Sequence, residues 1–297
     1  MSMSPRRWFV GGVVAVLLIS ALPLAAQRQR PLTPLPPNGL RVAPFFDGWY
    51  RNDDGSVTLS FGYSNLNTTD VVEIPHGPEN FIEPAEFDGG QPTSFPPLGH
   101  GSDNDRTRRR RGRERGVFTV TVPPGFSGEV VWTLVNQERT FSVPGSAQTG
   151  AYQLRWPMAM GSQPPLLSFT ADGPTGRGPS GVESPPMTAT VGTPLSIPVW
   201  LNDDSVRDEE VIPRRRRGTL VPARLSWFKH AGPGEVVFSE YSIPLEASQG
   251  MGTTEATFDQ PGEYVLRVRG DNFGQVDSSS GNQCCWTNGY VRVTVTD

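Results

Sequence analysis

The chain has 297 residues, of which 33 are glycine and 30 are proline, and it carries a formal net charge of -4. Proline inside a helix costs about 3 kcal/mol and glycine about 1 kcal/mol relative to alanine. This composition therefore excludes an all-α protein and disfavours a doubly wound α/β enzyme. The acidic balance argues against a nucleic-acid-binding protein, whose domain would carry net positive charge. We predict a turn-rich, all-β protein.

Residues 1–26 have the organisation of an export signal, with an Arg-Arg pair at 6–7, an apolar run at 10–24 and two alanines at 25–26. An apolar run of about 15 residues is shorter than the ~20 that cross a bilayer, which disfavours a retained anchor. The arginine pair also matches part of the twin-arginine signal, so that route and an ordinary secretory signal both stay open. Either one predicts a periplasmic or secreted chain, with no integral membrane segment once the signal is removed.

The proline-rich residues 27–44 predict an extended linker. A first β-sandwich domain is predicted over residues 45–157. In its clearest strand, 57–63, large side chains alternate with small or polar ones, which is the period of a half-buried strand. The preceding Asn52-Asp53-Asp54-Gly55 indicates a hairpin turn with the glycine at positive φ. Further strands are expected at 71–74, 117–122, 129–135 and 139–143.

A second β-sandwich domain is predicted over residues 163–297, because short strands separated by turns are typical of this architecture. The strands are expected at 166–170, 187–191, 195–201, 223–229, 235–238, 253–258, 263–269 and 290–296. Three tryptophans lie within strand patterns and are expected in the two cores: Trp132, Trp200 and Trp227.

The segment Pro261-Gly262-Glu263-Tyr264-Val265-Leu266-Arg267-Val268, after Gly232-Pro233-Gly234 and Ala256-Thr257-Phe258, resembles the polycystic-kidney-disease (PKD)-type immunoglobulin-like repeat. The matching tryptophan is Trp227, and the motif ends at Asp271. The resemblance covers residues 163–297 and is interrupted at 203–217 and 277–287. It implies an immunoglobulin-like sandwich, an extracellular role in binding, spacing or adhesion, and a tyrosine corner in which the Tyr264 hydroxyl bonds nearby backbone.

Two stretches of the first domain resemble signature stretches of uncharacterised exported bacterial proteins. They are Phe46-Asp47-Gly48-Trp49-Tyr50-Arg51-Asn52 and Asp88-Gly89-Gly90-Gln91-Pro92-Thr93. This resemblance implies no role for any residue.

Cys284 and Cys285 are the only cysteines, and because they are adjacent they cannot form the inter-sheet bridge of an antibody domain. We predict a vicinal disulfide between them, as an oxidising compartment would allow. Bonds to another chain and two reduced, buried thiols stay open as alternatives.

No metal site or cofactor is predicted, because the three histidines are widely spaced and no Cys-x-x-Cys motif occurs. Two groups of oxygen ligands could bind calcium: Asp47 with the acidic turn at 52–54, and the acidic turn at 202–204. However, Asn and Asp are common in turns for backbone reasons, which is the favoured interpretation.

Arginines are concentrated in two runs, with seven in 106–115 and four in 214–217. We interpret both as solvated, self-repelling loops, because they lack the interleaved aromatic residues that single-strand binding uses. Binding of an anionic polymer or a lipid headgroup is the alternative.

The favoured function is an exported, non-catalytic binding or interaction module with a protein or glycan partner at the cell envelope. No catalytic motif marks a site, and the Gly-rich match at 176–181 is false because Pro179 and its neighbours prevent the helix that a dinucleotide needs. One alternative is a secreted hydrolase with a pocket in the first domain near His76, Glu79 or Asp88.

The other alternative is a carbohydrate-binding accessory protein. Sugar rings would stack on aromatic side chains, at least two of which should be exposed on one face. The candidate ligand-binding residues are Phe46, Trp49, Tyr50 and Trp286, with Phe45 beside them.

Overall fold

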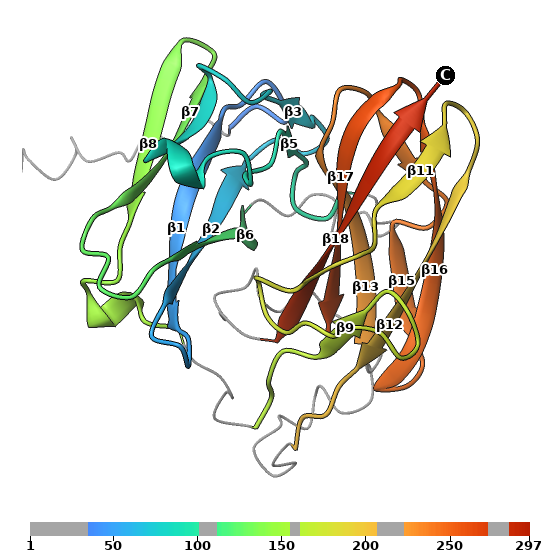
Figure 1. The fold of residues 1–297 in the computed structure, drawn as a ribbon. Coiled ribbons are helices and arrows are strands. Elements are labelled where there is room, and N and C mark those ends of the chain that lie inside the picture. Colours follow the sequence, from blue (N-terminus) through green and yellow to red (C-terminus); the bar gives the residue numbers. More distant parts are fainter. Residues whose placement is uncertain (1–34, 101–111, 155–160, 207–222, 273–284) are drawn as a thin grey trace, which may run out of the picture. The chain divides into compact units, whose positions relative to one another are not determined.

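The computed structural model describes residues 35–100, 112–154, 161–206, 223–272 and 285–297. Within these ranges the helical elements are two single turns of 3₁₀ helix, η2 (Ala85–Phe87) and η3 (Gly150–Tyr152), and all other regular structure is strand. The predicted all-β fold class is confirmed (Figure 1). Residues Pro37–Asp297 form one unit, to which the following description applies.

The N-terminal half contains three antiparallel sheets, in the orders β1-β2-β6, β4-β7-β8 and β3-β5. Their strands are β1 (Val42–Arg51), β2 (Val57–Asn65), β3 (Val72–Glu73), β4 (Asn80–Glu83), β5 (Ser94–Phe95), β6 (Gly112–Val122), β7 (Val130–Asn136) and β8 (Arg139–Gly145).

Aromatic rings fill the core of the N-terminal half. Phe61 of β2 stacks on Phe118 of β6 with ring centroids 5.3 Å apart, and Phe118 meets Trp132 of β7 edge to face at 4.9 Å. These contacts join the first sheet to the second, and all three side chains are buried. Aromatic pairs in this geometry add to the burial energy. The prediction that Trp132 lies in the core is confirmed.

The hairpin before β2 has the predicted form. The Asn52 amide donates to the Ser56 carbonyl at 3.0 Å, and Gly55 has φ = 83°. The strand before it, β1, was not predicted: residues 42–44 were assigned to the linker, and no strand was expected at 45–51, but β1 begins at Val42. Its first residue is held by Asn136, whose side chain accepts from the Val42 amide at 3.1 Å and donates to its carbonyl at 2.9 Å.

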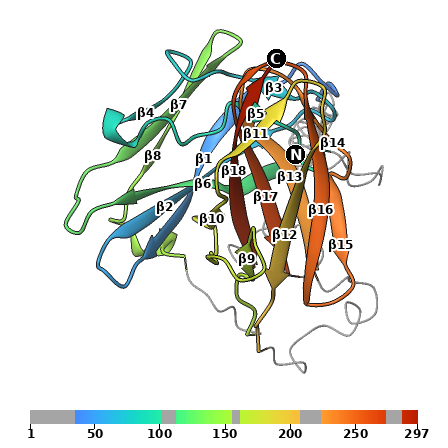
Figure 2. The same ribbon diagram turned by 45° about the vertical axis from the view of Figure 1, so that its right-hand side comes forward.

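The C-terminal half is a sandwich of two sheets, in the orders β14-β16-β12-β9 and β10-β18-β17-β13-β15. Both β10 and β11 pair with β18 in parallel, as Figure 2 shows. The strands are β9 (Leu166–Ser168), β10 (Val182–Glu183), β11 (Met187–Thr190), β12 (Leu195–Asn202), β13 (Ala223–Ala231), β14 (Val236–Phe238), β15 (Ser242–Leu245), β16 (Gln249–Phe258), β17 (Gly262–Asp271) and β18 (Trp286–Thr296).

A tyrosine corner closes one end of this sandwich, as the resemblance implied. The Tyr264 hydroxyl donates to the Gln260 carbonyl at 2.9 Å and accepts from the Gly234 amide at 3.0 Å. Its ring is buried in the core that both sheets share. The predicted role of Tyr264 is therefore confirmed, and it is structural.

Trp227 and Trp200 of this sandwich differ in burial. Trp227 is buried in the core, as predicted. The prediction for Trp200 is wrong: it is half-buried and lies opposite the exposed Met251 on the outer face of its sheet. In β12, Val199 and Leu201 take the inward positions, so the alternation of the strand turns the residue between them outward.

Candidate functional site at a buried junction

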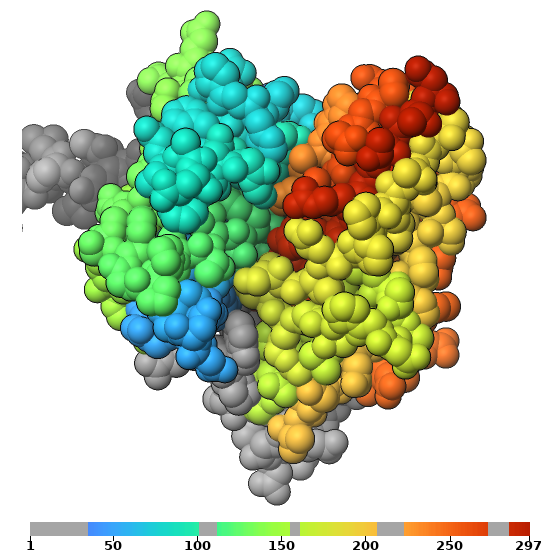
Figure 3. All heavy atoms as spheres, viewed as in Figure 1, coloured from blue at the N-terminus to red at the C-terminus, as the bar shows by residue number. Residues whose placement is uncertain are grey.

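Part of the outer face of the sheet β10-β18-β17-β13-β15 is charged and yet buried. Along β17, Leu266 and Val268 face the sandwich core, and Arg267 and Arg269 alternate with them on the opposite face. Each arginine is only 1% exposed. They are covered by β6 of the N-terminal half, and we call this contact of β6 with β17 and β18 the junction. Figure 3 shows the outer surface where the N-terminal half, coloured blue to green, meets the C-terminal half, coloured yellow to red.

Glu114 of β6 supplies the carboxylate at the centre of the junction. Its Oε1 atom accepts a hydrogen bond from Nη1 of Arg269 and lies 3.7 Å from Nη2 of Arg267. Arg269 also donates through Nε to Oδ2 of Asp271 at 3.0 Å, and Arg267 donates through Nη1 to Oδ1 of Asn288 at 3.2 Å. Two cations and two carboxylates thus balance each other out of contact with water, as buried charges require.

Burial perturbs the two arginines to different extents. It lowers the pKa of Arg267, and the nearby Glu114 only partly opposes this effect. Burial also acts to lower the pKa of Arg269, but Asp271 and Glu114 together outweigh it and the pKa is raised. The ring of Phe228 lies 4.4 Å from Cζ of Arg267 and 5.5 Å from Cζ of Arg269. Cation–π contact therefore adds to the support of both guanidinium groups.

Neutral side chains of β18 satisfy backbone groups of β6. Asn288 donates through Nδ2 to the Gly116 carbonyl at 2.7 Å and to the Pro179 carbonyl at 2.9 Å. The Tyr290 hydroxyl donates to the Val117 carbonyl at 3.0 Å, and burial raises its pKa to about 12. Because a buried carbonyl without a partner is costly, these contacts fix the register of β6 against β18.

Trp286 anchors the junction sterically. It is 1% exposed and packs against Gly116, where an added Cβ would lie only 2.2 Å from Cζ2 of the indole. Gly116 also has φ = 54°, a conformation that glycine adopts without strain. Both observations require glycine at this position of β6.

Asp47 forms a second buried ionic contact, where β1 shifts register against β2 between Phe46 and Gly48. Its carboxylate accepts from Nη2 of Arg113 at 2.7 Å and from the Gly116 amide at 2.9 Å, and lies 3.4 Å from Arg115. Burial raises the pKa of Asp47, and these hydrogen bonds and charges oppose the shift.

The interpretation of the arginine-rich run as a solvated loop is therefore wrong for Arg113 and Arg115, which are paired and largely shielded. The rest of both runs, residues 101–111 and 214–217, lies outside the described residues.

The segment between β3 and β5 also contacts the C-terminal sandwich. Lys229 of β13 lies 3.1 Å from the Glu73 carboxylate. The neighbouring His230 accepts the Thr93 amide with its backbone carbonyl at 2.8 Å, and its Nε2 atom is 3.0 Å from the Gly90 carbonyl. The backbone carbonyl and the side chain of His230 thus both contact the loop that contains Gly90 and Thr93.

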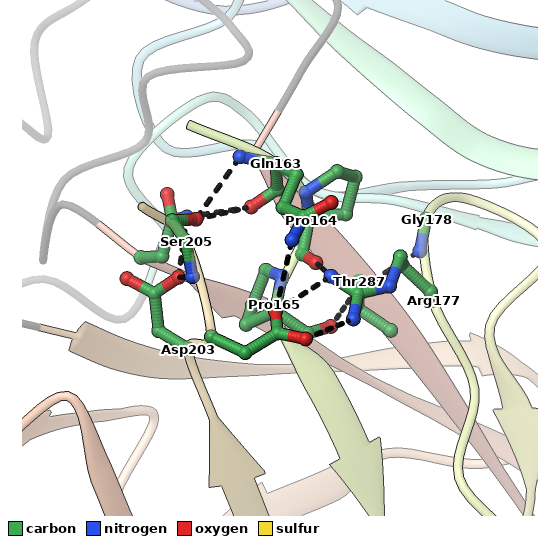
Figure 4. A network of polar contacts seen from close by, with 10 residues as sticks. Gln163, Pro164, Pro165, Arg177, Gly178, Asp203, Ser205 and Thr287 are labelled. Atoms are coloured by element: carbon green, nitrogen blue, oxygen red, sulfur yellow. Dashed lines mark hydrogen bonds and ion pairs between the residues drawn. The ribbon is translucent and has the colours of Figure 1, made fainter. Parts of the chain in front are cut away.

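A further polar network fixes the start of the C-terminal sandwich (Figure 4). The Gln163 amide donates to Oγ of Ser205 at 3.0 Å, and the Ser205 amide donates to Oδ1 of Asp203 at 3.1 Å. Across the same region, Thr287 accepts the Gly178 amide at 3.0 Å. The acidic turn at 202–204 thus takes part in backbone hydrogen bonding, in keeping with its interpretation as a turn. No group of three candidate metal ligands occurs among the described residues.

The aromatic residues proposed for ligand stacking are not exposed. Trp49, Tyr50 and Trp286 are 4%, 6% and 1% exposed, and Phe45 and Phe46 are half-buried. Phe46 packs on Phe61, and Trp49 donates through Nε1 to the Thr149 carbonyl at 3.1 Å. The exposure that carbohydrate stacking requires is therefore absent at Trp49, Tyr50 and Trp286, and it is only partial at Phe45 and Phe46.

The residues considered for a hydrolase are exposed and organise a loop. The Nε2 atom of His76 is 2.8 Å from the Gln91 carbonyl, and Asp88 accepts from the Gln91 side chain at 2.7 Å and from the Ile82 amide at 2.9 Å. Glu79 is exposed as well. These contacts give His76 and Asp88 structural partners.

Cys285 is buried and takes part in a disulfide bond. Its predicted partner, Cys284, lies outside the described residues, so the vicinal pairing stays a prediction. The proposed export signal at 1–26 also lies outside them. Across the described residues, the structure contains no helix of the length and apolarity needed to cross a membrane.

Sequence reasoning missed the residues of the junction. The alternation in Leu266-Arg267-Val268-Arg269 correctly predicts a strand with one charged face. Nothing local shows that this face is covered, and Glu114, its partner, lies 155 residues away from Arg269 in the sequence. The sequence feature that could have indicated a buried charged face is the pair Arg267 and Arg269, on one face of a strand that ends at Asp271.

No family model matches the sequence, and no curated protein matches it. Among solved structures, domains 4 and 5 of the S-layer protein SbsC are 13% identical over 59% of this chain and 69% of that one, with a TM-score of 0.25. The D00-D0 domain of intimin is 12% identical over 86% and 100%, with a TM-score of 0.27. Dpr2 Ig1-Ig2 in complex with DIP-Theta Ig1-Ig3 is 11% identical over 86% and 99%, with a TM-score of 0.22. The fold assignment above rests on strand pairing and the Tyr264 contacts.

Proposed function

We propose that the chain is an exported, non-catalytic interaction module that acts in the periplasm or outside the cell. The observation that supports this most is the junction. Its buried ionisable groups, Glu114, Arg267, Arg269 and Asp271, bind one another and thereby hold two β-sandwiches together. Charged groups used in this way are structural, because each is already satisfied by a partner of opposite sign.

A fixed junction gives the two sandwiches a defined relative orientation. Recognition by β-sandwiches uses loop tips and strand edges, which a rigid scaffold presents at set separations. We therefore propose that residues 45–157 and 163–297 are two domains that act as one body, and that their partner is a protein or glycan of the cell envelope. The carbohydrate alternative would need a platform other than Trp49, Tyr50 and Trp286, which are buried.

Binding can be tested with the chain purified from Gln27 onward. The probes are solubilised cell-envelope fractions and an array of glycans, with turnover of glycan and peptide substrates measured on the same samples. The proposal expects saturable binding to an envelope component without turnover. Substrate turnover without binding would contradict it and would favour the hydrolase.

Export can be tested separately by fractionating cells that express the full chain. We expect cleavage near Ala26 and recovery of the shortened chain outside the cytoplasm. Changing Arg6 and Arg7 to lysine distinguishes the routes: loss of export indicates the twin-arginine route, and continued export an ordinary secretory signal. A cytoplasmic chain that retains residues 1–26 would contradict the proposed location.

A further inference from the structure

His230 occupies an irregular position in β13. The register of β13 against β17 shifts between Lys229 and Ala231, so His230 is the extra residue of a β-bulge. Bulges re-aim side chains, and here the imidazole contacts the loop before β5. Its ring also meets Tyr290 of β18 edge to face, with centroids 5.5 Å apart. The side chain is thus enclosed between the two sandwiches and is 4% exposed.

The hydrogen bond of His230 to Gly90 sets the tautomer of the neutral imidazole. The Gly90 carbonyl can only accept, so Nε2 must carry the proton that it donates across 3.0 Å. In the neutral ring, Nδ1 is then unprotonated, and it has no hydrogen-bond partner among the residues that the structure describes. Protonation would place a second N–H at Nδ1 in a buried position with no acceptor.

The charged groups that face His230 also disfavour a proton. They are Arg267 of β17, Arg292 of β18 and His76 of the loop before β4. Both arginines have a carboxylate partner: Glu114 of β6 lies near Arg267, and Glu183 of β10 pairs with Arg292 at 3.2 Å. A positive imidazole would therefore add charge where positive charge is already present and solvent is excluded.

We propose that His230 is an acid-sensitive contact between the sandwiches: proton uptake by its imidazole releases the loop at residues 89–94 from β13. The released contacts are those of Nε2 with Gly90 and of the His230 carbonyl with the Thr93 amide. The function of such a device is to loosen the contact of this loop with β13 when the compartment becomes acidic, which rests on the proposed location in the periplasm or outside the cell.

The direction of the pH effect follows from linkage. Burial lowers the pKa of His230 from its ordinary 6.5 to about 3, and the nearby cations act in the same direction. When the loop at residues 89–94 is released, the imidazole regains its ordinary pKa of 6.5. Between about pH 3 and pH 6.5, this open form therefore binds more protons than the closed form, in which His230 is buried. The equilibrium between the closed and the open form does not change with pH above about 6.5. Below about pH 6.5, it shifts toward the open form about tenfold for each pH unit.

The test is hydrogen exchange at the Thr93 amide in the chain purified from Gln27 onward, corrected for the intrinsic pH dependence of exchange. We expect protection to fall about tenfold for each pH unit below about 6. In His230→Gln, whose side-chain amide can still donate to Gly90, protection should not change with pH. In the matched control His100→Gln, at an exposed histidine outside the loop at residues 89–94, it should fall as in the parent chain. Equal pH dependence in the parent chain and His230→Gln would overturn the proposal.

A second measurement needs no variant at position 230. The imidazole of each of the three histidines is followed by nuclear magnetic resonance in the parent chain, with His76→Gln to assign one signal. The proposal expects one histidine that stays neutral to well below pH 6 while the Thr93 amide is protected. If all three titrate near 6.5 in the folded chain, the proposal fails even where His230→Gln does not fold.

Discussion

The two faces of β17 are both buried, but they are stabilised in different ways. On the inner face, Leu266 and Val268 join an apolar core in which burial itself lowers the free energy. On the outer face, Arg267 and Arg269 lose their hydration and depend on Glu114 and other partners to offset that cost. The inner face does not depend on the exact geometry of each contact, because apolar contacts are non-directional. The outer face requires each partner in place.

This difference is tested most strongly by Glu114→Gln. The change keeps the shape of the side chain but leaves two buried guanidinium groups without their shared carboxylate. We expect a loss of about 3–5 kcal/mol in the free energy of unfolding, the cost of breaking a buried ion pair from one side. Chemical denaturation of both chains provides the measurement.

The matched control is Glu183→Gln, which makes the same change in the exposed pair with Arg292. Exposed ion pairs contribute about 0–1 kcal/mol, so its stability should stay close to that of the parent chain. Equal losses from the two variants would show that the junction is not shielded from water.

Gly116→Ala tests the steric side of the same contact. The new methyl group would meet the Trp286 ring, and the backbone at φ = 54° disfavours alanine. We expect a loss of about 1–3 kcal/mol, typical of overpacking. Gly150→Ala, where an added Cβ meets nothing within 4 Å, is the control and should be near neutral. A thermal melt that gives the same midpoint for both variants would contradict the packing of Trp286.

Tyr264→Phe gives the smallest expected effect and concerns the inner face. It removes one hydroxyl that bonds the Gln260 carbonyl and the Gly234 amide while leaving the buried ring in place. We expect a loss of about 1–2 kcal/mol in the free energy of unfolding. Tyr152→Phe, at an exposed tyrosine, should change it little. A neutral Tyr264→Phe variant would show that the ring alone makes the corner.

The sequence predicts the inner face better than the outer one. Alternation at residues 57–63 and 263–269, the Asn52–Gly55 turn and the Tyr264 corner follow from local rules of strand period and turn chemistry. The short strands β4, β5, β10 and β15 were not predicted, because they have two to four residues and their pairing comes from distant strands.

The junction could not be predicted for the same reason. Period-two patterning assigns Arg267 and Arg269 to the face opposite the core, and an isolated sandwich would leave that face in water. Whether Trp49 and Tyr50 are exposed likewise depends on what covers their sheet. Contacts between segments far apart in sequence decide both cases.

We propose that the buried junction makes one rigid body of the two sandwiches. Backbone ¹⁵N relaxation of the chain purified from Gln27 tests it at neutral pH. We expect a single rotational correlation time for amides of both cores, for example Leu59 and Leu266. Two distinct correlation times, each matching a body of about half the mass, would contradict it.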